Sequence, residues 1–230
     1  YGLQITFRST NKPNHFLKLT GIRYGMSMDI DGSNLISCNI LEEVNPVSSE
    51  VSINTMNFSF HSEKGEFDLL DLTGAYILFQ QRQSITVTGY IDGIRMNMGT
   101  FYLDKPKSTD NVVSMECIDL LGVMDDTEYL GGLWLNGISA KSLIDDIMKS
   151  ADISSDNYQI AEELQNITVS GYLPICTHRA ALQQVAFAIG AVVDCSRSEK
   201  IKITTLITNN SKTIPLDRKI VGRTQENTAL

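Results

Sequence analysis

Residues 85–103, ITVTGYIDGIRMNMGTFYL, decide the fold of the first half of the chain. Apolar and polar residues alternate on both sides of Asp92-Gly93. This pattern indicates two β-strands joined by a two-residue turn, and Asp-Gly suits that turn because both central residues need a positive φ. At Gly99 the alternation shifts by one residue, which predicts a β-bulge because a simple slip would turn every later side chain to the other face. The stretch therefore predicts an antiparallel hairpin with a bulge in its second strand.

Similar alternating segments surround this hairpin. A turn is expected at Asp31-Gly32, and a second bulge near Thr55, where the alternation changes phase. Together with the hairpin, these segments make about eight strands, a number typical of a closed or nearly closed β-barrel or a sandwich. The further expected strands fall within residues 3–7, 22–40, 51–60, 75–80 and 113–117.

After residue 119 the apolar spacing changes to the helical period. Residues 120–124 are expected to form one turn, followed by a loop at Gly131-Gly132. Ser139 is a suitable N-cap for a helix over residues 140–150, and Thr177 for a second helix that ends at Gly190. A hairpin over residues 192–205 would follow. The predicted fold is α+β: an N-terminal antiparallel β-barrel or sandwich over residues 1–128, then a small domain of two helices and a β-hairpin over residues 129–207. Residues 208–230 are expected to begin a further domain or to form a disordered tail.

Composition excludes several classes of function. The 230 residues are 42% apolar and carry 19 basic and 27 acidic side chains, which give a net charge of -8. The longest apolar run, residues 185–193, is too short for a membrane segment. No segment concentrates Lys and Arg, so specific nucleic-acid binding is not expected. The four cysteines and three histidines are widely spaced, which predicts reduced thiols and no metal or other cofactor.

Candidate catalytic groups are few, because the sequence has no phosphate-binding loop, nucleophile elbow or HExxH motif. Cys176 and His178 could in principle act as nucleophile and base, although a surface or capping role is expected for His178. The acidic group Asp119, Asp125, Asp126 and Glu128 could supply a glycosidase pair, but helix-end charges account for it as well. Trp134, the single tryptophan, could stack on a sugar from a loop or join two domains.

Several short blocks are similar to those of a known family. They are Phe67-Asp68-Leu69-Leu70, residues 99–104 (GTFYLD), residues 115–119 (MECID) leading into 121–125 (LGVMD), residues 171–177 (GYLPICT) and residues 179–190 (RAALQQVAFAIG). The order of these blocks resembles phage and prophage tail proteins of the baseplate-hub (tail-hub) type, in particular hub proteins from phages of Gram-positive bacteria. The similarity covers most of residues 35–206.

The resemblance implies a structural protein of the virion tail that is made in the bacterial host cytoplasm. It implies a tube-like β-barrel, three copies of which form a ring linking the tail tube or distal tail protein to the tip or spike protein. No enzymatic activity is expected. Apolar side chains between the two domains are candidates for oligomer or interdomain contacts, namely Tyr129, Leu130, Leu133 and Trp134. Two alternatives stay open: a carbohydrate-binding or adhesin module that uses Trp134, and a cell-wall hydrolase that uses Cys176 and His178.

Overall fold

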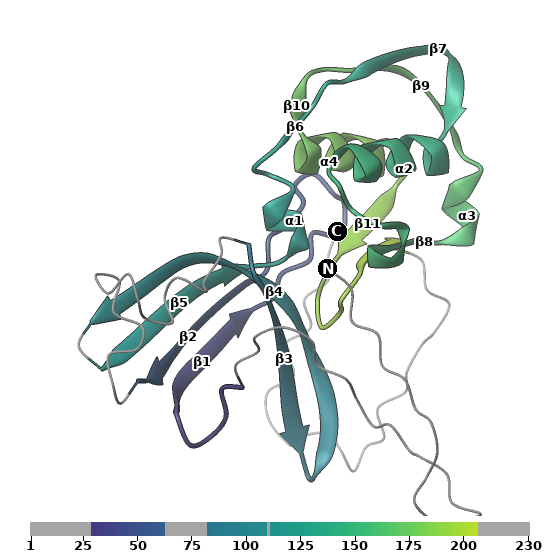
Figure 1. Cartoon of the computed structure of the whole chain (residues 1–230). Helices are drawn as coiled ribbons and strands as arrows, with labels where there is room; N and C mark the ends of the chain where they lie inside the picture. The colour runs from purple at the N-terminus through teal and green to yellow at the C-terminus, as the bar shows by residue number, and fades with distance from the viewer. Residues whose placement is uncertain (1–28, 63–81, 110, 207–230) are drawn as a thin grey trace, which may run out of the picture.

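The computed structural model describes residues 29–62, 82–109 and 111–206. A curled antiparallel sheet forms one end of the molecule, and helices with three small sheets form the other (Figure 1). The elements are β1 (Leu35–Leu41), β2 (Thr55–His61), β3 (Ser84–Ile91), β4 (Ile94–Thr109), β5 (Val112–Ile118), α1 (Leu120–Val123), β6 (Glu128–Tyr129), β7 (Gly132–Ser139), α2 (Ala140–Ser150), η2 (Ser155–Asn157), β8 (Tyr158–Ile160), α3 (Glu162–Gln165), β9 (Thr168–Leu173), β10 (Cys176–Thr177), α4 (His178–Ala188), β11 (Ala191–Asp194) and β12 (Ile201–Thr205).

The large sheet has five strands in the order β1-β2-β5-β4-β3, all antiparallel. It curls like half of a barrel, so the predicted β-rich fold is confirmed in outline, whereas closure is not seen among the described strands. Over that part of the chain β1 and β3 are the edges. The strands expected within residues 3–7 and 75–80 lie outside the described residues, as does most of the strand expected before Asp31-Gly32.

The turn and the bulge predicted for the β3–β4 hairpin are both confirmed. Asp92 and Gly93 have φ of 51° and 76°, as the two-residue turn requires. Val87 pairs with Gly99 and Thr88 with Asn97, so one residue of β4 is left over opposite β3, which is the predicted bulge. The bulge expected near Thr55 is wrong, because β2 starts at that residue and the chain before it is not a strand.

Alternation along the strands buries one face of this sheet. Buried side chains that share one face of the sheet form one hydrophobic cluster, made of Met56, Phe58, Phe60, Phe101, Leu103, Val113, Met115 and Cys117. The opposite positions along β2 and β5, such as Asn57, Ser59 and Ser114, are polar. The sheet therefore has an apolar inner face and a polar outer face.

The two expected helices are confirmed as α2 and α4. Ser139 Oγ accepts a hydrogen bond from the Ser142 amide at 3.1 Å, and Thr177 Oγ1 accepts one from the Ala180 amide at 3.2 Å. Gly190, with φ of 65°, follows the end of α4. The expected hairpin forms as β11 and β12, and β8 pairs with β12 in parallel. Two further strand pairs, β6 with β10 and β7 with β9, were not predicted from the sequence.

The connection between β1 and β2 joins the two ends of the molecule. Val51 is 2% exposed and belongs to the hydrophobic cluster built mainly by α2, α4, β11 and β12. Ser48 Oγ donates to the Ala191 carbonyl at 2.6 Å, and Arg197 donates to the Glu42 carboxylate through its backbone amide at 2.7 Å. These contacts fix the curled sheet against the helices. No helix within the described residues is long and apolar enough to cross a membrane.

Candidate functional site

A two-stranded ribbon crosses over the helices at the far end of the molecule from the β3–β4 turn (Figure 1). We call this ribbon, residues 128–139 with residues 168–177, the arch. Glu128 pairs with Thr177 in its first part, and Gly132 with Leu173 in its second. Between the two parts the pairing is interrupted at Leu130 and Gly131 on one strand and at Pro174 and Ile175 on the other. The loop expected at Gly131-Gly132 is thus a short break inside a ribbon, and Trp134 lies on strand β7, not on a loop.

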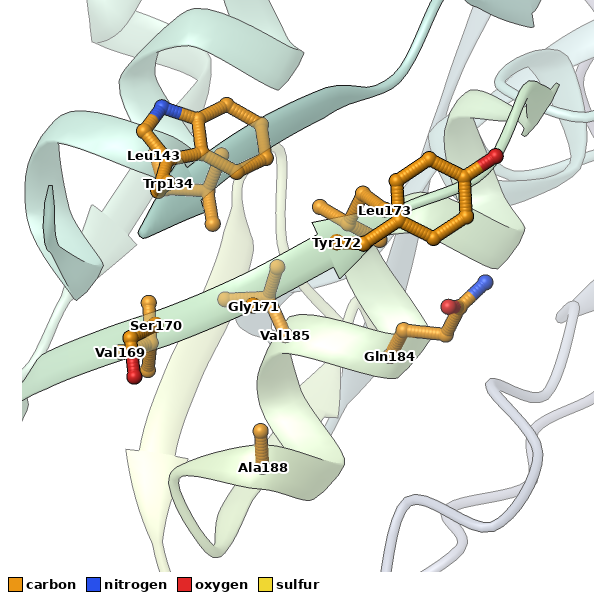
Figure 2. A pocket seen from close by; sticks show the side chains of 10 residues that line it. All are labelled: Trp134, Leu143, Val169, Ser170, Gly171, Tyr172, Leu173, Gln184, Val185 and Ala188. Atoms are coloured by element: carbon orange, nitrogen blue, oxygen red, sulfur yellow. The ribbon is translucent and has the colours of Figure 1, made fainter. Parts of the chain in front are cut away.

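The inner face of the arch covers an apolar pocket. Figure 2 shows this cavity of about 160 Å³, with Trp134 and Leu173 from the arch, Leu143 from α2, and Val185 and Ala188 from α4 in its walls. No charged side chain lines it. Trp134 stands opposite Gly171 in the ribbon. Ser170, Tyr172 and Gln184 add polar atoms to the lining. The pocket can therefore accept an apolar side chain, and it holds no formal charge.

The Trp134 indole is held against the arch itself. A Cβ atom on Gly132 would lie 2.4 Å from this ring, so the ring occupies the space beside the glycine. Trp134 is half-buried. The indole is therefore a wall of the pocket, in contrast to the exposed loop platform that sugar stacking was expected to use.

The outer face of the arch exposes large apolar side chains. Leu133 and Tyr172 pair directly across the two strands and are 62% and 70% exposed. Phe187 of α4 lies three residues after Gln184, which lines the pocket, so the two are neighbours along the helix surface. We call the exposed set the apolar arch surface; it consists of Leu130, Leu133, Leu135, Tyr172, Ile175 and Phe187. Large apolar side chains that gather on exposed surface often mark sites of protein contact, so these six residues of the arch and α4 are candidates for such a contact.

The four predicted contact residues do not share one face. Leu130 and Leu133 lie on the apolar arch surface, whereas Trp134 points to the pocket. Tyr129 is 4% exposed, and its hydroxyl donates to the Asp146 carboxylate at 2.6 Å, so it is a core residue. The residues that sequence reasoning missed are Leu135, Tyr172, Ile175 and Phe187. Alternation over residues 168–173 was the available signal for Tyr172.

Cys176 and His178 do not form a nucleophile–base pair. The imidazole is 2% exposed, which corrects the expected surface position. Its Nδ1 lies 3.0 Å from the Thr127 carbonyl and its Nε2 lies 3.0 Å from Ser150 Oγ, so both nitrogens have other partners. Burial raises the pKa of the Cys176 thiol, which disfavours the reactive thiolate. All four cysteines are free.

The acidic residues have separate structural contacts. Asp119 caps α1 by accepting from the Gly122 amide at 2.9 Å, and burial raises its pKa to about 6. Asp125 accepts from Arg179 at 2.9 Å, and this hydrogen bond lowers its pKa. Asp126 pairs with Arg82. Each of these carboxylates therefore has its own structural partner, and they do not form a catalytic pair. Among the described residues, no group of three or more His, Cys, Asp and Glu side chains could hold a metal ion.

No protein-family model and no curated protein sequence matches the chain. Solved structures with partial likeness include the tail protein from Neisseria meningitidis MC58, at 14% identity and a TM-score of 0.49 over 72% of this chain and 44% of that one. Others are the 43 kDa tail protein of prophage MuSo2 from Shewanella oneidensis, at 14% identity and 0.43 over 70% and 48%, and the prophage tail protein gp18 from Listeria monocytogenes EGD-e, at 9% and 0.46 over 73% and 43%. The chain spans less than half of the length of each.

Proposed function

We propose that the protein is a structural component of a phage or prophage tail, at the baseplate or tail-tip hub. In this role three copies assemble into a ring that links the tail tube to the tip. The observation that carries the proposal is the apolar arch surface, which a protein acting alone in water would not need. The order of sequence blocks that resembles tail-hub proteins supports the tail assignment.

The size of this surface suits association between protein chains. Six side chains that are 62–79% exposed present roughly 700 Å² of largely apolar area. A specific protein interface covers roughly 800 Å² on each partner. The pocket below has no charged lining, so burying this face would leave no unpaired charge there. We assign the face to contacts with other copies of the chain and with neighbouring tail proteins.

Carboxylates placed on the apolar arch surface are expected to abolish self-association. In the double variant Leu133→Asp/Tyr172→Asp, two adjacent charges would have to lose water on assembly, which should weaken it about a hundredfold or more. Sedimentation velocity over a range of concentrations measures the effect, and circular dichroism checks the fold.

A matched control carries the same two charges elsewhere. Gln159→Asp/Thr204→Asp changes two exposed strand residues away from the arch, on β8 and β12, and should assemble like the unchanged protein. A 25.5 kDa monomer at the highest concentration of the unchanged chain would contradict the proposal. Normal assembly of the Leu133→Asp/Tyr172→Asp variant would show that the contact lies on another face.

A further inference from the structure

A ring of three copies needs a second surface on each chain. In a cyclic trimer each contact is heterologous, so the apolar arch surface of one copy must meet a different surface of the next. This requirement rests on the proposed function. Because the arch surface is apolar, its partner should be another exposed apolar group. Among the described residues two groups of three such side chains lie outside the arch, besides Leu35, Ile36, Val112 and Leu206.

The tip of the β3–β4 hairpin is the first such group. Tyr90, Ile91 and Ile94 are 70%, 60% and 69% exposed. Ile91 and Ile94 face each other directly beside the Asp92-Gly93 turn. The hairpin projects away from the body at the end opposite to the arch (Figure 1). We call these three side chains the hairpin tip.

The hairpin tip is also held rigidly. Eight residue pairs connect β3 to β4, and both turn residues have the positive φ that a two-residue turn of this kind uses. A preformed tip loses little conformational freedom when it binds, so a larger share of the contact energy is available for association.

The second exposed apolar group fits the arch less well. It begins at Leu41, the last residue of β1, and continues with Val44 and Val47 after the strand; the three side chains are 45–59% exposed. These residues lie on the connection that is tied to the helices by Ser48 and Val51, so they flank the body of the protein. A projecting convex tip matches a concave pocket better than such a flank does.

Shape and charge connect the hairpin tip with the arch pocket. The cavity of about 160 Å³ has room for a branched aliphatic side chain, and apolar side chains make up much of its walls, together with the polar Ser170 and Gln184. Tyr172 lines this cavity as well, and Phe187 is an exposed residue of the helix that supplies Val185 and Ala188. Asp92 and Arg95 lie beside the tip and are exposed, so their charges can stay in water at the rim while Ile91 and Ile94 enter a pocket that has no charged lining.

We propose that the hairpin tip of one copy docks into the arch pocket of the next copy, between Tyr172 and Phe187. Three exposed side chains cover roughly 350 Å² on the hairpin, which is small for a stable interface. A single contact of this kind is weak. Ring closure gives every copy two contacts and stabilises the whole assembly more than any one pair.

Complementation between two defective variants tests the pairing. The tip variant Ile91→Asp/Ile94→Asp and the arch variant Leu133→Asp/Tyr172→Asp are each expected to lose assembly by about a hundredfold or more. Each still has one intact surface. Their equimolar mixture should therefore form a one-to-one dimer at high concentration, seen by sedimentation with a fluorescent label on one partner. A third variant, Val44→Asp/Val47→Asp, should assemble like the unchanged chain.

Each result separates this inference from the proposed function. If the tip variant assembles normally while the arch variant does not, the hairpin is not the partner surface, and the structural role stands. Loss of assembly in Val44→Asp/Val47→Asp, with normal assembly of the tip variant, would move the contact to the flank after β1. A mixture that stays monomeric would show that the tip does not meet the arch. An unchanged chain that never assembles would overturn the proposed function itself.

Discussion

Replacing Gly131 with alanine is expected to lower the free energy of unfolding by about 3 kcal/mol. Gly131 has φ of 73°, which an alanine adopts only with strain. A Cβ atom there would also lie 2.4 Å from the Leu173 carbonyl oxygen and 2.9 Å from the Pro174 carbonyl carbon. Both are backbone atoms, so relief requires the two strands of the arch to move apart. Urea denaturation followed by circular dichroism measures the loss.

Gly190→Ala is the matched control for this prediction. Gly190 has a similar φ of 65°, but a Cβ atom there would meet nothing within 4 Å. The control should lose only the part due to backbone strain, about 1 kcal/mol. The difference between the two variants measures the close approach of the arch strands. Equal losses would mean that the strands separate at Gly131 without resistance.

Structural features that depend on only a few neighbouring residues were predicted correctly. Asp92-Gly93 needs only its own turn geometry, and Ser139 and Thr177 cap helices through amides three residues ahead. The bulge at Gly99 is also visible in the sequence, because a strand that changes phase while keeping its apolar face inward must contain an extra residue. These features depend on local chemistry, so one sequence is enough to place them.

The arch was not predicted because glycines occur both in loops and at places where two chain segments pack closely. Gly131, Gly132 and Gly137 are typical of a loop, yet in the structure they allow two strands and an indole ring to approach closely. Treating the segment as a loop also placed Leu133 and Trp134 together, whereas strand alternation puts them on opposite faces. The candidate site could therefore be predicted in part only.

Contacts between segments that are far apart in the chain could not be predicted from the sequence pattern. Nothing in the neighbourhood of Val51 shows that it packs among helices that follow it by about a hundred residues. The burial of His178 likewise depends on Thr127 and Ser150, which approach from other elements. These placements follow from tertiary packing, which local propensity does not determine.

Asp119 is expected to make stability depend on pH between about 5 and about 7.5. This carboxylate is 1% exposed and lies where the sheet meets the helices. It accepts from the Asn54 amide at 3.0 Å and the Gly122 amide at 2.9 Å. Burial nevertheless outweighs these hydrogen bonds and the charge of Arg179, and raises the pKa from 3.8 to about 6.

The sign of the effect follows from where the proton binds more tightly. The folded protein holds the Asp119 proton more strongly than the unfolded chain, because the pKa is raised on folding. The stabilisation is fully present below the unfolded pKa of 3.8 and is lost as the pH rises through the folded pKa of about 6. The full shift corresponds to about 3 kcal/mol, of which about 1 kcal/mol appears between pH 7.5 and pH 5.

Asp119→Asn isolates this contribution. The amide has nearly the same shape, can still accept one of the two backbone hydrogen bonds and does not titrate. Carboxylates whose pKa is lowered on folding, such as Asp125, act in the opposite direction but equally in both proteins, so they cancel in the difference. Relative to the variant, the unchanged protein should gain about 1 kcal/mol on going from pH 7.5 to pH 5 in urea titrations. A difference that stays constant over this range would mean that the Asp119 carboxylate remains charged in the folded protein, and that the junction between sheet and helices is open to water.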